Sequence, residues 1–471
     1  MEIYEYGNKS AGIVLIQPVD GHDLEMIEKE TSAIRENTAG DFMLAAFKVD
    51  DWNKDLSPWT APAVFGKEDF GEGAEQTLNE ILKYCSDSSR TYYLGGYSLA
   101  GLFALWAVYR TDIFQGVAAV SPSMWFPGFD KYMKENSIKC KNVYLSLGDR
   151  EEKTKNSVMA TVGDRIREAN AHLREQDVNC VLKWNEGNHF KEPELRTAKG
   201  FSHILLNGKL DRLKDYIRGL GSLAVGFSGG VDSTLLLFVA HEVLGDRAIA
   251  ATSRAVFVPE REAGEAEDFC RKHGIKQFIC RVNPLEIESC KYNHPDRCYH
   301  CKRMIFSEII RIAKENGIEY VAEGSNMDDL GDYRPGLKAV EELKVTSPLR
   351  MAGLSKAEIR LLSKELGLPT WSKPAYACLA SRFVYGEEIT KEKLQMIDLA
   401  EQFLIENGFL QERVRLHGNL ARIEVPEEDI PRLSSEAMRK AVYERFREIG
   451  FTYVSMDLQG YKVGSMNAVL D

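Results

Sequence analysis

The sequence predicts an α/β protein built from two or three domains, and three observations lead to this fold class. The chain has 471 residues, whereas a typical domain has about 150. Short apolar runs alternate with amphipathic helical segments through most of the chain, as in layered α/β folds. After residue 381 the rhythm changes to a helix followed by closely spaced strands. We therefore expect domains at residues 1–204, 205–380 and 381–471.

The expected elements follow this division in order. In the first domain, strands are expected at residues 12–17, 42–49, 92–95, 117–120, 143–147 and 181–184, and an Asn207-Gly208 turn signal marks the seam. In the second, buried runs at 223–227, 249–252, 277–281 and 320–323 predict a doubly wound parallel sheet. In the third, helices at 391–407 and 439–449 and strands at 413–416, 421–425 and 453–458 predict a small α+β subdomain.

Composition excludes several classes of protein. Hydrophobic residues make up 44% of the chain, which argues against disorder or a fibrous repeat. No apolar run approaches the ~20 residues of a membrane helix, and the first residues lack the zones of a signal peptide. Nine irregularly spaced cysteines favour reduced thiols over a disulfide framework. We therefore expect a cytoplasmic protein without a membrane partner.

Charge disfavours nucleic acid as a partner. The net charge is −11, and residues 206–471 are nearly balanced, with 37 Lys and Arg against 40 Asp and Glu. A surface that binds RNA or DNA carries an excess of basic residues. The balance suits a small phosphorylated ligand better.

A serine in the first half has the surroundings of a nucleophile. Ser98 follows an expected strand and opens an expected helix, with Gly96 two residues before it and Ala100 two residues after. Small residues at these positions permit the sharp turn that exposes a nucleophilic hydroxyl. The backbone N–H of Leu99 would then be one oxyanion donor, and a second would come from the loop around Val19 or Asp20. The alternative is a serine that only caps the helix.

A serine nucleophile needs a base and an orienting acid. His189 follows the last expected strand of this domain and is the candidate base. Glu151 is the candidate acid, although Asp149 and Glu152 are equally reachable from the sequence. Residues 10–200 resemble the esterase-D-like branch of the α/β-hydrolases, which have the same order of serine, acid and histidine.

A glycine-rich loop in the second half predicts a phosphate site. It follows an expected strand, opens an expected helix and reads Ser228-Gly229-Gly230-Val231-Asp232-Ser233. Glycines let backbone N–H groups approach phosphate oxygens, and Asp232 can help to hold Mg²⁺. The lysine of a Walker A loop is missing. The loop resembles the PP-loop of ATP pyrophosphatases, which release pyrophosphate and leave AMP on the substrate.

Other ATP-binding residues are expected where neighbouring parallel strands end. Ser253 follows the second strand, and Gly324 follows the fourth. Asp328 and Asp329 come shortly afterwards and are candidate metal ligands, although they could equally cap the next helix.

Three cysteines are candidates for metal or redox chemistry. Cys298 and Cys301 form a Cys-x-x-Cys motif just before an expected helix at 302–316, a position that favours thiolates. Such a pair can bind zinc or an iron–sulfur cluster, or form a redox couple. Cys378 is the best third ligand in the sequence. The other six cysteines are expected to be buried and inert: 85, 140, 180, 270, 280 and 290.

Five motifs, in order through residues 206–471, resemble the LarE family of ATP-dependent sulfur transferases. They lie at 228–233, 297–302, 331–336, 377–382 and 464–467. The resemblance implies that ATP adenylates a carboxylate of pyridinium-3,5-biscarboxylic acid mononucleotide. A sulfur nucleophile then produces the thiocarboxylate, a step toward the nickel-pincer nucleotide cofactor.

The resemblance also implies cofactors and further site residues. In the single-cysteine form, the residue matching Cys378 gives up its own sulfur. In the three-cysteine form, the residues matching Cys298, Cys301 and Cys378 hold a 4Fe–4S cluster that carries a transferable sulfide. All three are present, so the cluster form is favoured, with ATP and Mg²⁺ as further cofactors and an unidentified sulfide donor. We also expect a homo-oligomer.

The phosphate of the substrate should bind to basic residues of the third domain. Arg413 and Arg415 alternate on one expected strand and therefore face the same side, and guanidinium groups suit phosphate. Ser381 could add a hydroxyl, and Glu424 is a candidate metal ligand by the same resemblance. The alternative is that the two arginines lie on an exposed sheet face and are only solvated.

Three other functions remain open. An ATP-dependent amidotransferase of the NAD- or GMP-synthetase kind would use the same loop without cysteine ligands. A tRNA thiolase is disfavoured by the charge balance. The first domain could also be a non-catalytic docking module.

Overall fold

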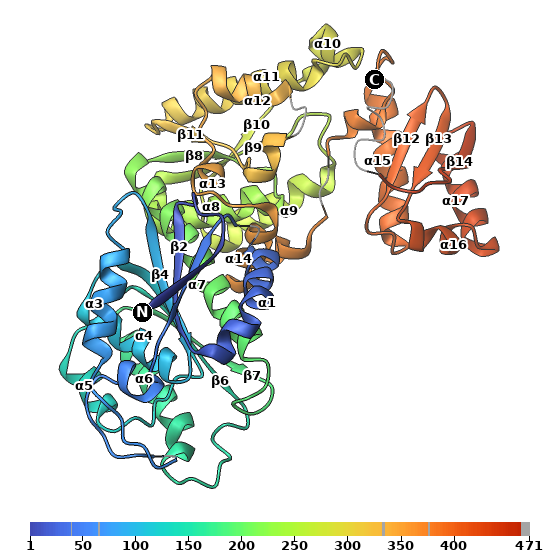
Figure 1. Ribbon diagram of the computed structural model, residues 1–471. Coiled ribbons are helices and arrows are strands. Elements are labelled where there is room, and N and C mark those ends of the chain that lie inside the picture. The colour runs from blue at the N-terminus through green and yellow to red at the C-terminus, as the bar shows by residue number, and fades with distance from the viewer. Residues whose placement is uncertain (39, 65, 332–334, 375–376, 463–471) are drawn as a thin grey trace. The chain divides into compact units, whose positions relative to one another are not determined.

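The computed structural model describes residues 1–38, 40–64, 66–331, 335–374 and 377–462. It divides into two compact units, Met1–Asp211 and Arg212–Asp471 (Figure 1). No helix among these described residues is both long and apolar enough to cross a membrane. The predicted fold class, α/β with a parallel sheet in each of the two larger parts, is confirmed.

The first unit is built on a seven-stranded sheet with the order β1-β3-β2-β4-β5-β6-β7. Strand β1 is antiparallel to β3, and the other neighbours are parallel. The sequence did not predict β1 because its residues are mostly exposed and form no apolar run. The strands are β1 (Glu2–Gly7), β2 (Ile13–Val19), β3 (Met43–Lys48), β4 (Thr91–Tyr97), β5 (Phe114–Val120), β6 (Asn142–Gly148) and β7 (Asn179–Asn185).

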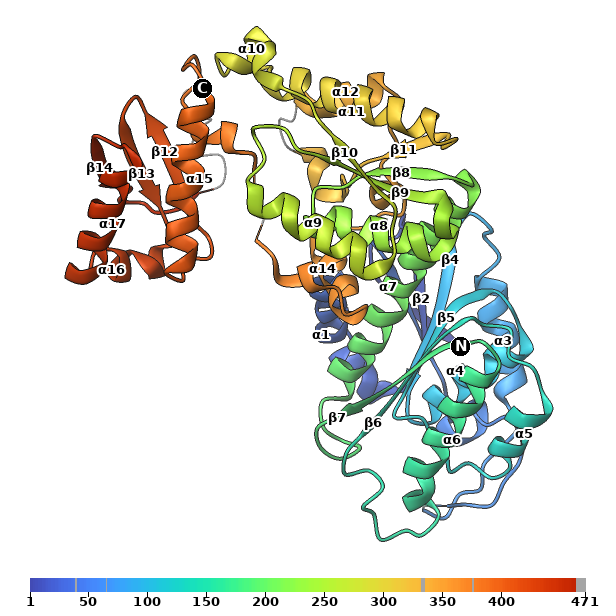
Figure 2. The same ribbon diagram turned by 180° about the vertical axis from the view of Figure 1, so that it is seen from behind.

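Helices cover both faces of this sheet (Figures 1 and 2). One face packs on α3 (Ala74–Tyr84), α4 (Leu99–Arg110) and α6 (Val162–Glu175). The other packs on α1 (Gly21–Thr38) and α7 (Pro193–Leu220). Alternation along β2 explains both cores, since Val14 and Ile16 face the first set of helices and Leu15 faces the second.

The turn predicted at Asn207-Gly208 is wrong, because both residues lie inside α7. A Cβ at position 208 would lie 2.1 Å from the Tyr93 hydroxyl oxygen, so glycine is needed here for close packing. The Asn207 side chain donates to the His203 carbonyl, one turn earlier on the same helix. Two residues typical of turns therefore serve a helix that packs tightly on its sheet.

The second unit contains a four-stranded parallel sheet with the order β10-β9-β8-β11. Its strands are β8 (Leu223–Gly226), β9 (Ala248–Ser253), β10 (Gln277–Cys280) and β11 (Tyr320–Ala322). Helices α11 (Arg297–Glu315) and α12 (Pro335–Glu342) lie on one face. Helices α8 (Val231–Leu244), α9 (Glu260–His273) and α14 (Lys356–Glu365) lie on the other (Figures 1 and 2).

A smaller three-stranded sheet follows in the chain, with the order β12-β13-β14. It comprises β12 (Arg413–His417), β13 (Leu420–Glu424) and β14 (Tyr453–Met456). Helices α15 (Lys391–Glu406) and α17 (Glu436–Ile449) pack on it and close one apolar core. The remaining helices are short: α2 (Trp52–Asp55), α5 (Phe129–Glu135), α10 (Glu288–Lys291), α13 (Pro348–Met351) and α16 (Ile430–Leu433).

Candidate active sites

Ser98 lies on a strained turn between β4 and α4. Its backbone has φ 58° and ψ −120°, a region that residues other than glycine rarely adopt. A Cβ at Gly96 would lie 2.6 Å from the Ala100 carbonyl carbon, so this turn requires glycine two residues before the serine. The geometry is that of a nucleophile elbow.

The structure brings Ser98, His189 and Glu151 into one hydrogen-bonded chain. His189 Nε2 lies 3.0 Å from Ser98 Oγ, and His189 Nδ1 lies 2.7 Å from Glu151 Oε2. The other two candidate acids are engaged elsewhere: Asp149 accepts from the Gly187 N–H, and Glu152 pairs with Arg167. The three side chains have the contacts of a catalytic triad.

The second oxygen of Glu151 is held by three donors. Oε1 accepts from Ser121 Oγ at 2.7 Å, from the Gly148 N–H at 2.7 Å and from Arg196 Nη1 at 3.1 Å. Burial acts to raise the pKa of Glu151, but its hydrogen bonds and the charge of His189 bring it below the ordinary value. The carboxylate is thus kept ionised with Oε2 directed at His189. Sequence reasoning missed Arg196, since it comes from α7 and has no motif around it.

Of the oxyanion donors expected from the sequence, the one at Asp20 does not fit. Its N–H donates to the Asp23 carboxylate at 3.3 Å. This contact belongs to the first turn of α1.

The phosphate loop joins β8 to α8 and is held by its own serines. Ser228 Oγ and Ser233 Oγ lie 3.1 Å apart, and Ser233 Oγ also donates to the Gly230 carbonyl at 3.2 Å. Gly229 has φ +72°, which glycine adopts without strain. Helix α8 begins directly after Gly230, so its first N–H groups lie at the loop.

Two other predicted ATP-binding residues lie where β11 and β9 end. A Cβ at Gly324 would lie 3.1 Å from the Ser233 backbone nitrogen, so glycine allows the end of β11 to approach the loop. Ser253, at the end of β9, has a buried hydroxyl oxygen without a hydrogen-bond partner among the described residues. A buried hydroxyl of this kind is costly unless a ligand satisfies it.

Asp328 and Asp329 are used for backbone contacts. Asp328 accepts from the Lys356 N–H, and Asp329 accepts from the Asn326 N–H, at 2.8 and 2.9 Å. Both aspartates therefore accept backbone N–H groups, as the helix-capping alternative expects.

The three candidate thiols share one neighbourhood of the second unit. Helix α11 begins at Arg297, so Cys298 and Cys301 lie inside its first turns and not before it as predicted. Burial, and then the nearby thiols of Cys378, Cys290 and Cys298, raise the pKa of Cys301. Cys290, predicted to be an inert thiol on its own, belongs to the same neighbourhood. Its pKa is raised to about 11, mainly by burial.

The thiols do not form a metal site as they stand. In the described ranges, no group of three His, Cys, Asp or Glu side chains is close enough to hold a metal ion. Cys378 is exposed, whereas Cys298 and Cys301 are half-buried. The arrangement therefore does not fit a three-cysteine cluster, although it keeps the thiols together.

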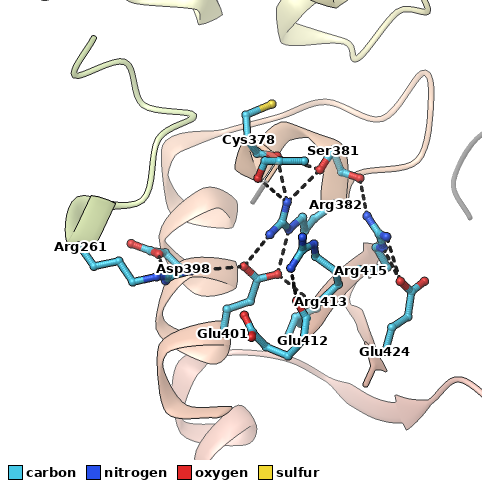
Figure 3. Close-up of polar contacts among 12 residues, drawn as sticks. Arg261, Cys378, Ser381, Arg382, Asp398, Glu401, Glu412, Arg413, Arg415 and Glu424 are labelled. Carbon is cyan, nitrogen blue, oxygen red and sulfur yellow. Dashed lines mark hydrogen bonds and ion pairs between the residues drawn. The ribbon is translucent and has the colours of Figure 1, made fainter. Parts of the chain in front are cut away.

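Two buried arginines hold the backbone around Cys378, and one of them, Arg382, is labelled in Figure 3. Arg382 donates to the carbonyls of Ala377 and Cys378 at 2.6 and 3.2 Å, and it forms a bidentate ion pair with Glu401. Arg297 donates to the Ala380 carbonyl at 2.7 Å and to Cys298 Sγ at 3.5 Å. Burial acts to lower the pKa of Arg297, but the Cys378 and Cys298 thiols raise it overall. These contacts link the Cys378 segment to the start of α11.

The predicted phosphate-binding residues are brought together, but the arginines are buried. Arg413 and Arg415 are 2% and 6% exposed, so the alternative of a solvated sheet face is wrong. Arg415 pairs with Glu424 Oε2 at 2.8 Å and donates to the Ser381 carbonyl at 3.0 Å (Figure 3). Arg422 engages the other oxygen of Glu424 at 2.9 Å. With both oxygens bound to guanidinium groups, Glu424 does not fit the role of a metal ligand.

A cavity of about 310 Å³ lies beside the segment that follows Cys378. Its lining includes Arg254, directly after Ser253, and Leu379, directly after Cys378, with Lys391 and Asp398 of α15. The motif residues at 332–334 and 464–467 lie outside the described residues.

Comparisons with known proteins agree with this geometry. No family model matches the chain. An uncharacterised protein of Synechocystis is 41% identical over 266 residues, which are 56% of this chain and 99% of that protein. The pyridinium-3,5-bisthiocarboxylic acid mononucleotide synthase of Lactiplantibacillus plantarum is 36% identical over 255 residues, 54% of this chain and 92% of that protein. A component of the glutamine-hydrolysing GMP synthase of Thermoplasma volcanium is 31% identical over 205 residues, 40% of this chain and 65% of that protein.

The phosphate loop at a strand-to-helix junction of a parallel sheet makes the second unit an ATP pyrophosphatase of the PP-loop class. Through its C-terminal half the chain belongs to the LarE family, which includes the Lactiplantibacillus synthase. A solved structure of an IroE-like serine hydrolase from Shewanella oneidensis matches with a TM-score of 0.39 and 13% identity, over 66% of this chain and 95% of that one. This similarity is too low to support any inference about the first unit. The assignment of the triad depends on the hydrogen bonds among Ser98, His189 and Glu151.

Proposed function

We propose that the second unit is an ATP-dependent sulfur transferase that converts a carboxylate of pyridinium-3,5-biscarboxylic acid mononucleotide into a thiocarboxylate. The observation that carries this proposal is the 36% identity to a bisthiocarboxylic acid mononucleotide synthase over 92% of that protein. The cavity between Arg254 and Leu379 supports it, because the residues before these two are Ser253 of the ATP site and Cys378.

The reaction needs ATP because a carboxylate is inert toward thiols. The substrate carboxylate attacks the α-phosphorus, the bond to the bridging oxygen breaks, and pyrophosphate leaves with the electron pair. Ser228, Ser233 and the N–H groups at the start of α8 would bind the phosphates. Asp232 pairs with Lys356 and accepts from Asn326, so it would hold a Mg²⁺ ion shared with phosphate oxygens only once Lys356 turns away. Arg413, Arg415 and Ser381 would bind the substrate phosphate.

We propose Cys378 as the sulfur-bearing residue. It is exposed, and its backbone is fixed by Arg382. In the sacrificial route its thiolate displaces AMP to give a thioester. Loss of the Cα proton then breaks the Cβ–S bond, which leaves dehydroalanine and the thiocarboxylate without any oxidant. A 4Fe–4S cluster on Cys298, Cys301 and Cys378 would need these side chains to move together. The nine free thiols suit a reducing cytoplasm.

For the first unit we propose a serine hydrolase that cleaves esters through Ser98, His189 and Glu151. Attack by Ser98 on an ester carbonyl passes its proton to His189, which returns it to the leaving alcohol. Water then releases the acyl group by the same route. Glu151 stays ionised and stabilises the imidazolium.

One experiment separates the transferase from its alternatives. The full-length protein is incubated anaerobically with ATP and Mg²⁺, and AMP formation is compared for three acceptors. These are the pyridinium-biscarboxylate mononucleotide, the nucleotide substrates of NAD and GMP synthetases with ammonia, and unmodified tRNA. AMP formed with the first alone, with oxygen replaced by sulfur in the product, supports the proposal. AMP formed with the second favours the amidotransferase, for which the GMP synthase relatives provide a reason.

A further inference from the structure

The loop that carries His189 is irregular and contains a strained residue. Residues 186–192 join β7 to α7 without a helix or strand of their own. Glu192 has φ +52°, a left-handed conformation that is uncommon for a residue with a side chain, and Gly187 has φ +103°. Because no regular element fixes this loop, the position of the His189 imidazole depends on the groups that bind the loop backbone.

Tyr97 binds this loop at His189 itself. It is the last residue of β4, directly before Ser98, and it is only 8% exposed. Its hydroxyl donates to the His189 carbonyl at 2.6 Å, and its ring centroid lies 5.1 Å from that of the imidazole. Burial, and then the charge of Glu151, raise the pKa of Tyr97 to about 12, so the hydroxyl keeps the proton that it donates. His189 is therefore bound at its backbone by Tyr97 and at its imidazole by Ser98, two consecutive residues.

Arg196 and Asp149 hold the same loop just before His189. Arg196 Nη2 donates to the Glu186 carbonyl at 2.9 Å, and Arg196 Nη1 donates to the Tyr97 hydroxyl at 3.2 Å. Asp149 Oδ1 accepts from the Gly187 N–H at 2.8 Å. Side chains thus bind the loop backbone at three of its first four residues, and the Tyr97 hydroxyl joins two of these contacts.

We infer that Tyr97 is a positioning residue of the hydrolase site, whose hydroxyl holds the His189 backbone so that Nε2 stays within hydrogen-bond distance of Ser98. Asp149 assists by holding the start of the same loop. This inference rests on the proposed hydrolase function of the first unit. Tyr97 exchanges no proton during the reaction, because its whole effect passes through His189. Misplacement of a catalytic group by about 1 Å can cost about a hundredfold in rate.

The first test compares two tyrosine variants of the full-length protein in the hydrolysis of a short chromogenic ester. Tyr97→Phe keeps the ring and loses the hydroxyl, so kcat should fall about tenfold to a hundredfold while KM stays unchanged. The matched control is Tyr92→Phe, near the other end of the same strand. Tyr92 is also buried and its hydroxyl also donates to a backbone carbonyl, that of Asp87, so this variant should keep the wild-type kcat.

Two further comparisons separate positioning from a general loss of structure. In a His189→Ala background, Tyr97→Phe should cause no further loss of the residual rate. Asp149→Ala should lower kcat, whereas Asp149→Asn keeps a side-chain oxygen for the Gly187 N–H and should retain most of the activity. A further loss in the double variant, or an inactive Asp149→Asn, would overturn the inference. Thermal unfolding of each variant shows whether it is folded.

A measurement without substrate separates this inference from the hydrolase proposal. The proton between His189 Nδ1 and Glu151 is followed by proton NMR and identified by its absence from His189→Ala. It should exchange with water faster in Tyr97→Phe than in the wild type or Tyr92→Phe. Unchanged exchange or an unchanged kcat in Tyr97→Phe would contradict the positioning role and leave the hydrolase proposal standing. Faster exchange in Tyr97→Phe, with a wild type that cleaves no ester, would contradict the hydrolase proposal alone.

Discussion

Arg382 and Glu401 form a fully buried bidentate ion pair, with contacts of 2.8 and 2.9 Å, beside the segment that carries Cys378 (Figure 3). Glu401 also accepts from the Val414 N–H at 3.0 Å, so the pair joins α15 and β12 to the Cys378 backbone. The arginine can hold the Cys378 carbonyl only while Glu401 compensates its charge.

Loss of one partner of this pair should destabilise the protein strongly. In Arg382→Met the buried carboxylate of Glu401 loses its bidentate partner and keeps only the Val414 N–H and Arg261 at 4.0 Å, which should lower the free energy of unfolding by about 3–5 kcal/mol. Urea unfolding measures the change, and Arg439→Met, at an exposed position of α17, should stay within about 0.5 kcal/mol of the wild type. The double variant Arg382→Met/Glu401→Leu should recover most of the stability but still transfer sulfur poorly, because the carbonyls of Ala377 and Cys378 have lost the Arg382 donor. A double variant with normal transfer would contradict the positioning role.

The triad predicts esterase activity that depends on three side chains. Ser98→Ala, His189→Ala and Glu151→Gln should each reduce hydrolysis of a short acyl ester by about ten-thousandfold. Arg196→Met should also reduce it, because Glu151 Oε1 loses a cationic partner. The release of a chromogenic alcohol measures the rate, with Ser89→Ala as an exposed serine control. Full activity in Ser98→Ala would leave the docking-module alternative for the first unit.

Glu412 predicts a pH dependence of stability. It is fully buried, and neither carboxylate oxygen has a hydrogen-bond partner in the part of the chain that the structure describes. Burial, and then the charge of Glu401, raise its pKa from 4.5 to about 8. Between these values the folded protein keeps a proton that the unfolded chain loses. The free energy of unfolding should therefore fall as the pH rises, by up to ~1.4 kcal/mol per pH unit.

Glu412→Gln should remove this contribution and make the protein more stable near pH 8. Urea unfolding at several pH values between about 5 and 8 measures the slope. Glu406→Gln, at an exposed position of α15, should leave it unchanged. A slope that persists in Glu412→Gln would show that Glu412 is not the titrating group.

Replacing Ser253 should weaken ATP binding without lowering the stability of the protein. Its buried hydroxyl lacks a partner within the described ranges, so Ser253→Ala should not reduce the stability of the protein without ligand. With ATP the variant loses a hydrogen bond to phosphate or ribose, and the ATP concentration that gives half of the maximal single-turnover rate should rise about tenfold. Thermal unfolding and single-turnover rates of AMP formation test the two parts. An unchanged half-saturating ATP concentration would remove Ser253 from the ATP site.

Much of the fold and part of each site could be predicted from sequence because the signals are local. The elbow at Ser98 and the glycine loop at 228–233 depend on neighbouring residues, and both lie where expected. The choice of Glu151 over Asp149 depends on which side chain reaches His189, which only the folded loop decides. Arg196 had no signal in the sequence, since its contact with Glu151 joins residues 45 positions apart.

The same reasoning explains what was missed around Cys378. Arg382 stands inside a recognised motif, but its burial and its partner Glu401 follow from the packing of α15 on β12. Cys290 is an ordinary core residue in the sequence, and only the fold brings it near the other thiols.

The central claim is that the second unit activates a carboxylate with ATP so that sulfur carried by Cys378 can replace oxygen. The most direct measurement is a single turnover of anaerobic full-length protein with ATP, Mg²⁺ and the pyridinium-biscarboxylate mononucleotide, followed by mass spectrometry of product and protein. Wild type should form the thiocarboxylate with release of AMP and pyrophosphate, whereas Cys378→Ala should release pyrophosphate and stop at the acyl-adenylate without sulfur transfer. Thiocarboxylate formed by Cys378→Ala at the wild-type rate, or AMP formation that does not depend on the carboxylate substrate, would contradict the account.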